Sequence, residues 1–203
     1  MGKMKILLDQ FSEQLSLSGS HIIKELQPGI DRTIVEKSIR DFSLNLPDEV
    51  FELYAWRNGL NPEYLESSEV GEMELFKLGI FPPFEISLEE YNDYAWKNNY
   101  YEKSFFPLFG SGGGDYFLIN CEDESNERGR IYYFTLSSYE FDKWISMYDS
   151  LETLIQTITY CYKEGAYSYN LEEGPSLQID IPLEREICRV NNPLSDYWKS
   201  LEC

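Results

Sequence analysis

Catalysis by an activated serine or cysteine requires a nearby base, and histidine supplies that base most often. His21 is the single histidine among the 203 residues, and it stands in residues 19–23, away from any nucleophile motif. The sequence contains no HExxH pattern and no cluster of zinc ligands. We therefore expect a structural or surface role for His21, and we predict no catalytic, metal-binding or cofactor-binding residue.

The glycine-rich segment 110–115 is the next candidate, because glycine-rich loops can bind phosphate. The pattern G-x-G-x-x-G would need glycine at position 115, which is aspartate, and the Lys-Ser/Thr of a P-loop is absent. A β-rich run follows the segment, whereas a phosphate-binding loop opens a helix. We interpret Gly112, Gly113, Gly114 and Asp115 as a turn between two strands, whose glycines adopt positive φ angles.

Negative charge dominates the composition. The chain has 17 Lys and Arg residues and 36 Asp and Glu residues, which gives a net charge of −19. Residues 61–130 alone carry 5 basic and 15 acidic residues, a net charge of −10. Such a surface repels nucleic acid and anionic membranes and attracts a basic protein partner. Charge that only keeps the chain soluble is the alternative explanation.

Two acidic runs are candidate surfaces for such a partner. They consist of Glu66, Glu69 and Glu72 in the first run, and of Glu122, Asp123, Glu124 and Glu127 in the second. Carboxylates in these runs would accept charge-assisted hydrogen bonds from lysine and arginine side chains of the partner. A solvated acidic surface is the alternative for both runs, and the spacing of a calcium-binding loop is absent.

The cysteines and the N-terminal residues indicate the cellular compartment in which the protein functions. Cys121, Cys161, Cys188 and Cys203 form no CxxC pair, so the sequence indicates neither a zinc ribbon nor a disulfide framework. Reduced thiols in a cytosol are the simplest explanation. The apolar run near the N-terminus stops at Leu8, which is too short for a signal peptide, and no stretch has the length of a bilayer span. We expect a cytoplasmic protein.

Helix signals dominate the first half of the sequence. Asp31 can cap a helix whose apolar face carries Val35, Ile39 and Phe42. Pro47 suits the first position of the next helix, and Asn58-Gly59 would end that helix with a left-handed cap. We also expect a weak helix over 5–18, a loop or short hairpin over 61–74, a strand over 80–86 and a helix over 88–101.

Strand signals follow in the second half. The β-rich runs 105–109, 116–121, 130–135 and 143–147 are joined by turn residues and predict an antiparallel meander. Asp149 and Glu152 would then form the capping box of a helix with an apolar stripe from Leu151 to Tyr162, closed by Gly165. Helices, then a sheet, then a helix indicate the α+β class.

Four groups of residues occur in a distinctive order. They are Leu46-Pro47 with Val50, Tyr54 and Trp56-Arg57-Asn58-Gly59; Phe106-Pro107-Leu108-Phe109-Gly110 with Gly112-Gly113-Gly114-Asp115-Tyr116; Gly129-Arg130-Ile131-Tyr132-Tyr133 with Ser150-Leu151-Glu152-Thr153-Leu154-Ile155; and Asn192-Pro193 with Tyr197-Trp198. This order and spacing resembles the SUKH superfamily, which includes the Smi/Knr-type yeast cell-wall regulators and many bacterial immunity proteins. The resemblance covers about residues 30–165, and the tail matches more weakly.

The resemblance implies an α+β fold with a central, mostly antiparallel sheet flanked by helices. It also implies a non-enzymatic bacterial immunity protein that binds and neutralises a cognate polymorphic toxin, often a nuclease; the acidic charge would suit a basic toxin. A regulatory or scaffold module of the same fold, with no toxin partner, is the alternative. We expect one domain over residues 1–165, with residues 166–203 as a C-terminal extension packed on it.

Overall fold

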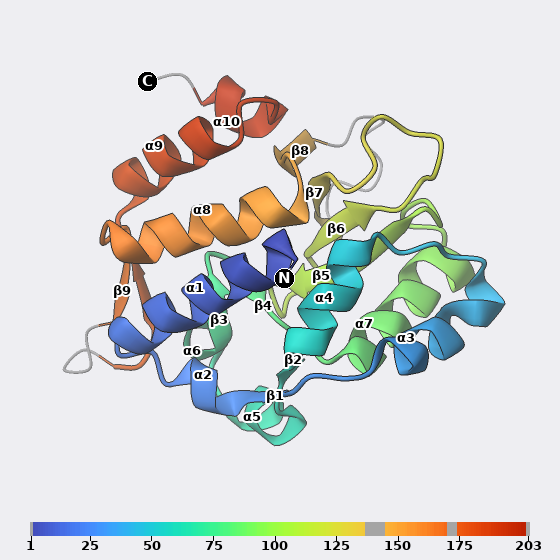
Figure 1. The fold of residues 1–203 in the computed structure, drawn as a ribbon, viewed down its shortest axis with the longest axis horizontal. Coiled ribbons are helices and arrows are strands. Elements are labelled where there is room, and N and C mark those ends of the chain that lie inside the picture. Colours follow the sequence, from blue (N-terminus) through green and yellow to red (C-terminus); the bar gives the residue numbers. More distant parts are fainter. Residues whose placement is uncertain (1, 137–144, 170–173, 202–203) are drawn as a thin grey trace.

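The computed structural model describes residues 2–136, 145–169 and 174–201 (Figure 1). Its centre is a curled sheet of six strands in the order β3-β4-β5-β6-β7-β8, with antiparallel neighbours. These strands are β3 (Glu74–Phe76), β4 (Gly79–Ile80), β5 (Phe105–Gly110), β6 (Tyr116–Asn120), β7 (Ile131–Phe134) and β8 (Ile145–Tyr148). The α+β class and the antiparallel meander are confirmed, although residues 143 and 144 of the last expected strand lie outside the described residues.

The glycine-rich segment is the turn between β5 and β6, as the sequence predicts. Gly110 pairs with Tyr116, and the Ser111 N–H donates to the Asp115 carbonyl oxygen at 2.9 Å. Gly112 and Gly114 have φ angles of 77° and 92°, a left-handed region that side-chain-bearing residues rarely adopt.

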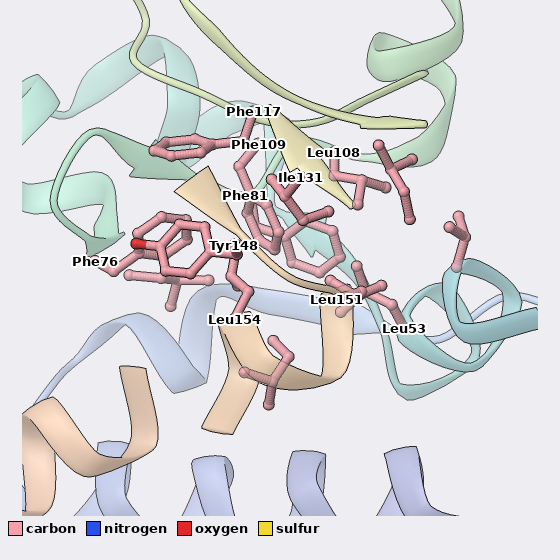
Figure 2. Packing of buried hydrophobic residues seen from close by; sticks show 14 of the residues in the cluster. Leu53, Phe76, Phe81, Leu108, Phe109, Phe117, Ile131, Tyr148, Leu151 and Leu154 are labelled. Atoms are coloured by element: carbon pink, nitrogen blue, oxygen red, sulfur yellow. The ribbon is translucent and has the colours of Figure 1, made fainter. Parts of the chain in front are cut away.

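One face of the sheet packs against α4 (Asp48–Trp56) and α8 (Leu151–Lys163), and α1 (Lys3–Leu17) packs against both of these helices. Figure 2 shows leucines of α4 and α8 facing phenylalanine rings of the strands across a continuous apolar layer. The expected stripe on α8 is confirmed, because all five of its members are buried: Leu151, Leu154, Ile155, Ile158 and Tyr162. Each such burial contributes roughly 1.5–3 kcal/mol, which explains why this stripe determines where α8 lies.

The start of α8 differs from the prediction by one residue. Ser150 is the N-cap, and its hydroxyl accepts from the Thr153 N–H at 3.1 Å while the Thr153 hydroxyl accepts from the Ser150 N–H at 2.9 Å. The capping box is therefore Ser150–Thr153, and the predicted pair Asp149–Glu152 is wrong. The Asp149 carboxylate instead accepts from the Leu194 N–H at 3.0 Å, which connects it to the C-terminal segment.

The segment between β4 and β5 is helical earlier than expected. The expected strand over 80–86 is wrong beyond Ile80, because α7 (Phe84–Tyr91) begins directly after Pro83. A π-helical segment, η2 (Asn92–Lys97), continues α7 and ends before the predicted position 101. Both pack on the meander through aromatic rings, as Tyr91 contacts Phe106 and Tyr94 contacts Tyr116.

The Asn58-Gly59 pair has a different role from the helix cap that was expected. Helix α4 ends at Trp56, and Arg57–Leu60 forms β2, which pairs with β1 (Leu26–Pro28). The Asn58 side chain accepts from the Phe84 N–H at 2.9 Å and donates to Glu85 at 3.2 Å, so it holds the start of α7. Gly59 has a φ of 69°, and a Cβ there would lie 2.2 Å from the carbonyl carbon of Pro82. Glycine is therefore required by a close approach of two backbones.

The remaining N-terminal elements are short. They are α2 (Ile22–Glu25), α3 (Arg32–Ile39), η1 (Arg40–Phe42), α5 (Pro62–Ser67) and α6 (Val70–Met73). Asp31 caps α3 as predicted, because its carboxylate accepts from the Thr33 N–H at 2.8 Å. Pro47 is the N-cap of α4 and not its first helical residue. The predicted loop or hairpin over 61–74 is wrong, since Asn61 caps α5 and α6 follows.

The C-terminal segment contributes the hairpin β9 (Tyr167–Tyr169) and β10 (Leu177–Ile179), then α9 (Ile181–Asn191) and α10 (Asp196–Ser200). Helix α9 lies along α8 (Figure 1). Ser195 donates to the Ser146 carbonyl oxygen of β8 at 2.8 Å, and Trp198 is buried against Tyr148. In the part of the chain that the structure describes, no helix is both long and apolar enough to cross a membrane.

Candidate functional site

The acidic loop between β6 and β7 is partly paired within the protein. Asp123 forms an ion pair with Arg128 at 2.7 Å and accepts from the Asn45 amide at 2.7 Å. Glu127 pairs with Arg130 at 2.8 Å and accepts from the Tyr132 hydroxyl at 3.0 Å. These two carboxylates stabilise the loop. Glu122 and Glu124 are exposed and form no ion pair with any described residue.

The second acidic run lies on α5 and α6. Glu66 and Glu69 are exposed, whereas Glu72 is half-buried and its carbonyl oxygen accepts from Tyr64. Helix α5 and the β6–β7 loop occupy opposite ends of the molecule in Figure 1. The structure therefore does not unite the two predicted acidic runs into a single surface.

A groove of about 600 Å³ lies between α5–α6, α7 and the β5–β6 turn. Leu65, Val70 and Met73 form one wall, and the other walls come from β4, β5, α7 and the glycine turn. Gly112, whose φ of 77° favours glycine, lies at the groove, and a Cβ there would stand 3.4 Å from both Ile80 and Val70. The glycine turn predicted from sequence is thus part of a binding-sized hollow.

The floor beside the turn is held by hydrogen bonds to Asp115. Its carboxylate accepts from the Ser111 and Tyr133 hydroxyls, each at 3.3 Å. Because the carboxylate has these partners, Asp115 shapes the turn and connects it to β7. Of the residues predicted as a structural motif, the four at 112–115 border or support the groove, while Asn58 and Gly59 orient α7, which forms another wall.

Glu90 of α7 supplies the one charged side chain of the groove lining within the described residues. Burial, with smaller contributions from Asp93 and Glu89, raises the pKa of the Glu90 carboxyl to about 7. Its Oε2 atom is buried and has no hydrogen-bond partner in the described part of the chain. Glu90 is half-buried, and burial of one carboxylate oxygen without a hydrogen-bond donor among the described residues makes the charged form less favourable.

Sequence reasoning missed Glu90. It is one of 36 acidic residues and belongs to neither acidic run. The available signal is helical spacing, since Ser87, Glu90 and Tyr94 share a face at i, i+3 and i+7 and all three line the groove. That spacing alone does not distinguish a groove from a core.

Three other side chains with catalytic potential, His21, Cys121 and Cys188, are held within the structure. His21 shares a hydrogen bond of 2.5 Å with the Tyr64 hydroxyl, which supports the structural role expected for it. Burial raises the pKa of the Cys121 thiol to about 12, and a hydrogen bond with Cys161, then burial, raises that of Cys188. Protonated, buried thiols are poor nucleophiles. Within the described residues, no group of three His, Cys, Asp or Glu side chains is placed to hold a metal ion.

These features define an acidic α+β protein with a partly apolar groove beside a curled antiparallel sheet. The chain belongs to the SMI1/KNR4 family (SUKH-1), whose model matches residues 31–157. The match confirms the resemblance and covers all six strands of the sheet, β3 to β8, together with the first half of α8. No curated protein sequence matches the chain significantly.

Proposed function

We propose that this chain is a non-enzymatic bacterial immunity protein that binds and neutralises a cognate toxin protein with a basic surface. Membership of the SUKH-1 family supports a binding role of the immunity or regulatory type. The net charge of −19 supports a basic partner. The observation that carries the proposal is the open groove, because it combines apolar walls with an unpaired carboxylate and so suits a basic polypeptide.

Neutralisation would proceed by occlusion. The acidic surface steers the basic toxin into contact, and apolar contacts in the groove then slow its dissociation. If the toxin is a nuclease, carboxylates of the immunity protein occupy the positions at which phosphates would bind and exclude the nucleic acid. This mechanism requires no bond to be made or broken.

The proposal is tested in cells that express the protein encoded by the reading frame next to the gene for this chain. The test asks whether this chain rescues their growth. Co-expression of the chain should restore growth, and the two purified proteins should form a complex in size-exclusion chromatography. Growth arrest that persists despite soluble expression of the chain, together with separate elution of the two proteins, would contradict the immunity role.

A regulatory or scaffold module is the second candidate, because the same family description includes the SMI1/KNR4 proteins. Affinity purification distinguishes the two roles. A cellular protein recovered with the chain in stoichiometric amount, in a strain without an adjoining toxin gene, would favour the regulatory role.

A further inference from the structure

The groove has the shape and charge to bind one specific kind of side chain. This inference deepens the proposed function, and it relies on that function only for the statement that the partner is a toxin. The first observation is the electrostatic character of the lining. Glu90 contributes a carboxylate, and no lysine, arginine or histidine lines the groove within the described residues. The remaining wall residues are apolar, small or aromatic.

The two basic side chains that follow Glu90 most closely in sequence are already engaged. Lys97 forms an ion pair with Asp93 at 2.5 Å, and the ammonium of Lys103 lies 3.8 Å from the centre of the Trp96 ring. Neither residue lines the groove. The described residues therefore provide no counterion for Glu90, and its buried Oε2 atom has no hydrogen-bond donor.

The dimensions also fit a side chain with its flanking residues. Ligand pockets typically enclose about 300–1,000 Å³, and the groove at about 600 Å³ falls within that range. Val70 at the mouth of the groove is 45% exposed, so an apolar surface is available there for a partner side chain. Lysine and arginine carry long apolar stems below a charged group, so such a side chain can contact apolar walls along its length and a carboxylate at its end.

We propose that the groove between α5–α6, α7 and the β5–β6 turn receives a lysine or arginine side chain of the toxin, whose cationic group pairs with Glu90. The apolar stem packs against the walls formed by Val70, Ile80 and Ile86. The glycines of the turn leave room for the backbone on either side of the inserted residue.

The first experiment probes the groove directly and requires no toxin. The full chain, labelled with ¹⁵N, is titrated with n-butylguanidinium and, in parallel, with n-butylurea, its uncharged analogue. We expect butylguanidinium to shift the amide signals of Gly112, Gly113 and Gly114 and to bind about tenfold more tightly than butylurea. Equal affinities for the two compounds, or no shift at these glycines, would overturn the proposal.

Variants on α7 supply the matched comparison. Glu90→Gln should weaken butylguanidinium binding about tenfold. Glu89→Gln removes an exposed carboxylate from the same helix and should leave the affinity within about twofold, since exposed charges are screened by water. Thermal unfolding of both variants confirms that each is folded. Equal affinities in the two variants would exclude Glu90 as the binding group.

The second experiment separates this proposal from the proposed function. If the chain binds its toxin, Glu90→Gln should weaken the complex about tenfold or more, and Glu89→Gln should not. A toxin complex that is insensitive to Glu90→Gln would refute the groove proposal while the immunity role stands. Failure of the chain to bind or neutralise any toxin, with butylguanidinium still bound through Glu90, would refute the immunity role while the cation site stands.

Discussion

Glu90 is a carboxylate for which burial makes ionisation unfavourable. Its pKa is raised to about 7, first by burial and then by the negative charges of Asp93 and Glu89 on the same helical segment. The other titratable groups near it are Tyr94 and Tyr101, whose pKa values are raised in part by Glu90 itself. A carboxyl with a raised folded-state pKa stabilises the folded state at low pH, and this stabilisation is lost as the pH rises towards 7.

Glu90→Gln should therefore change the pH dependence of stability. Near pH 4 the variant and the parent should have similar free energies of unfolding, because the carboxyl is mostly protonated in both the folded and the unfolded parent. Near pH 8 the variant should be more stable by about 1–2 kcal/mol, a figure reduced for partial solvent exposure. Urea denaturation at both pH values measures the difference. An equal difference at both pH values would show that Glu90 does not titrate in this range.

At the scale of elements, backbone contacts and buried polar groups hold the walls of the groove in place. Gly59 and Gly19 have similar φ angles of 69° and 79°, yet a Cβ at Gly59 would overlap Pro82, whereas a Cβ at Gly19 would meet no non-adjacent residue within 4 Å. The two glycines thus share a backbone conformation and differ in packing. Comparing them separates conformational strain from steric overlap.

Gly59→Ala should destabilise the fold more than Gly19→Ala. The Gly19 variant carries only the cost of a positive φ, about 1 kcal/mol, while the Gly59 variant also forces β2 away from Pro82 and should lose about 3 kcal/mol or more. Thermal or chemical unfolding of the two variants gives both values. Similar losses would mean that β2 and Pro82 separate at little cost.

The contact between α9 and the sheet includes a buried carboxylate. Glu184 is 1% exposed, accepts from the Tyr167 hydroxyl at 2.6 Å and lies 3.6 Å from the Lys77 ammonium between β3 and β4. The interaction with Lys77 is an ion pair without close hydrogen-bond geometry, so the Tyr167 hydrogen bond is the stronger attachment. Glu184 thereby connects three segments that are distant in sequence.

Glu184→Ala should cost about 2–4 kcal/mol, because it leaves the buried Tyr167 hydroxyl and the Lys77 charge without their partner. Glu186→Ala, on the exposed face of the same helix, is the control and should change stability by less than about 0.5 kcal/mol. Denaturant midpoints of the two variants provide the comparison. A Glu184 variant as stable as the control would show that this carboxylate does not contribute to the attachment of α9.

At the scale of the whole molecule, charge governs association with a partner more than it governs the fold. Glu66 and Glu69 extend from the helices that border the groove, and Glu122 and Glu124 extend from a loop at the opposite end of the molecule. Long-range attraction depends on the total charge, whereas the final contact depends on charges beside the binding surface. Variants of the two glutamate pairs therefore distinguish long-range electrostatic attraction from charge interactions at the binding surface.

Replacing Glu66 and Glu69 by lysine should slow association with a basic toxin about tenfold at about 50 mM salt, and the effect should shrink at about 500 mM salt. Replacing Glu122 and Glu124 should slow association less than about threefold, since only net charge changes. Stopped-flow or surface-based association kinetics measure both. A larger effect of the loop pair would place the partner at that end of the molecule.

Local signals in the sequence determined much of the fold. The turn at 110–115, the strands beside it, the Asp31 cap and the apolar stripe of α8 were all predictable, because each depends on residues within one turn or one short run. The errors have two origins. Asn58 has a role set by a partner distant in sequence, the Phe84 N–H that it binds. The caps at Asn61 and Ser150 are local, and there the sequence pattern was assigned to the wrong residues.

The sequence by itself therefore determined the class of fold, the meander and the acidic character of the molecule, since composition and short-range periodicity carry that information. Only the tertiary structure decided which carboxylates are paired and where the groove lies. Asp123 and Glu127 are indistinguishable from Glu122 and Glu124 until Arg128 and Arg130 are placed beside them. Glu90 acquires its raised pKa through burial, a property that arises when α5–α6, α7 and the β5–β6 turn come together.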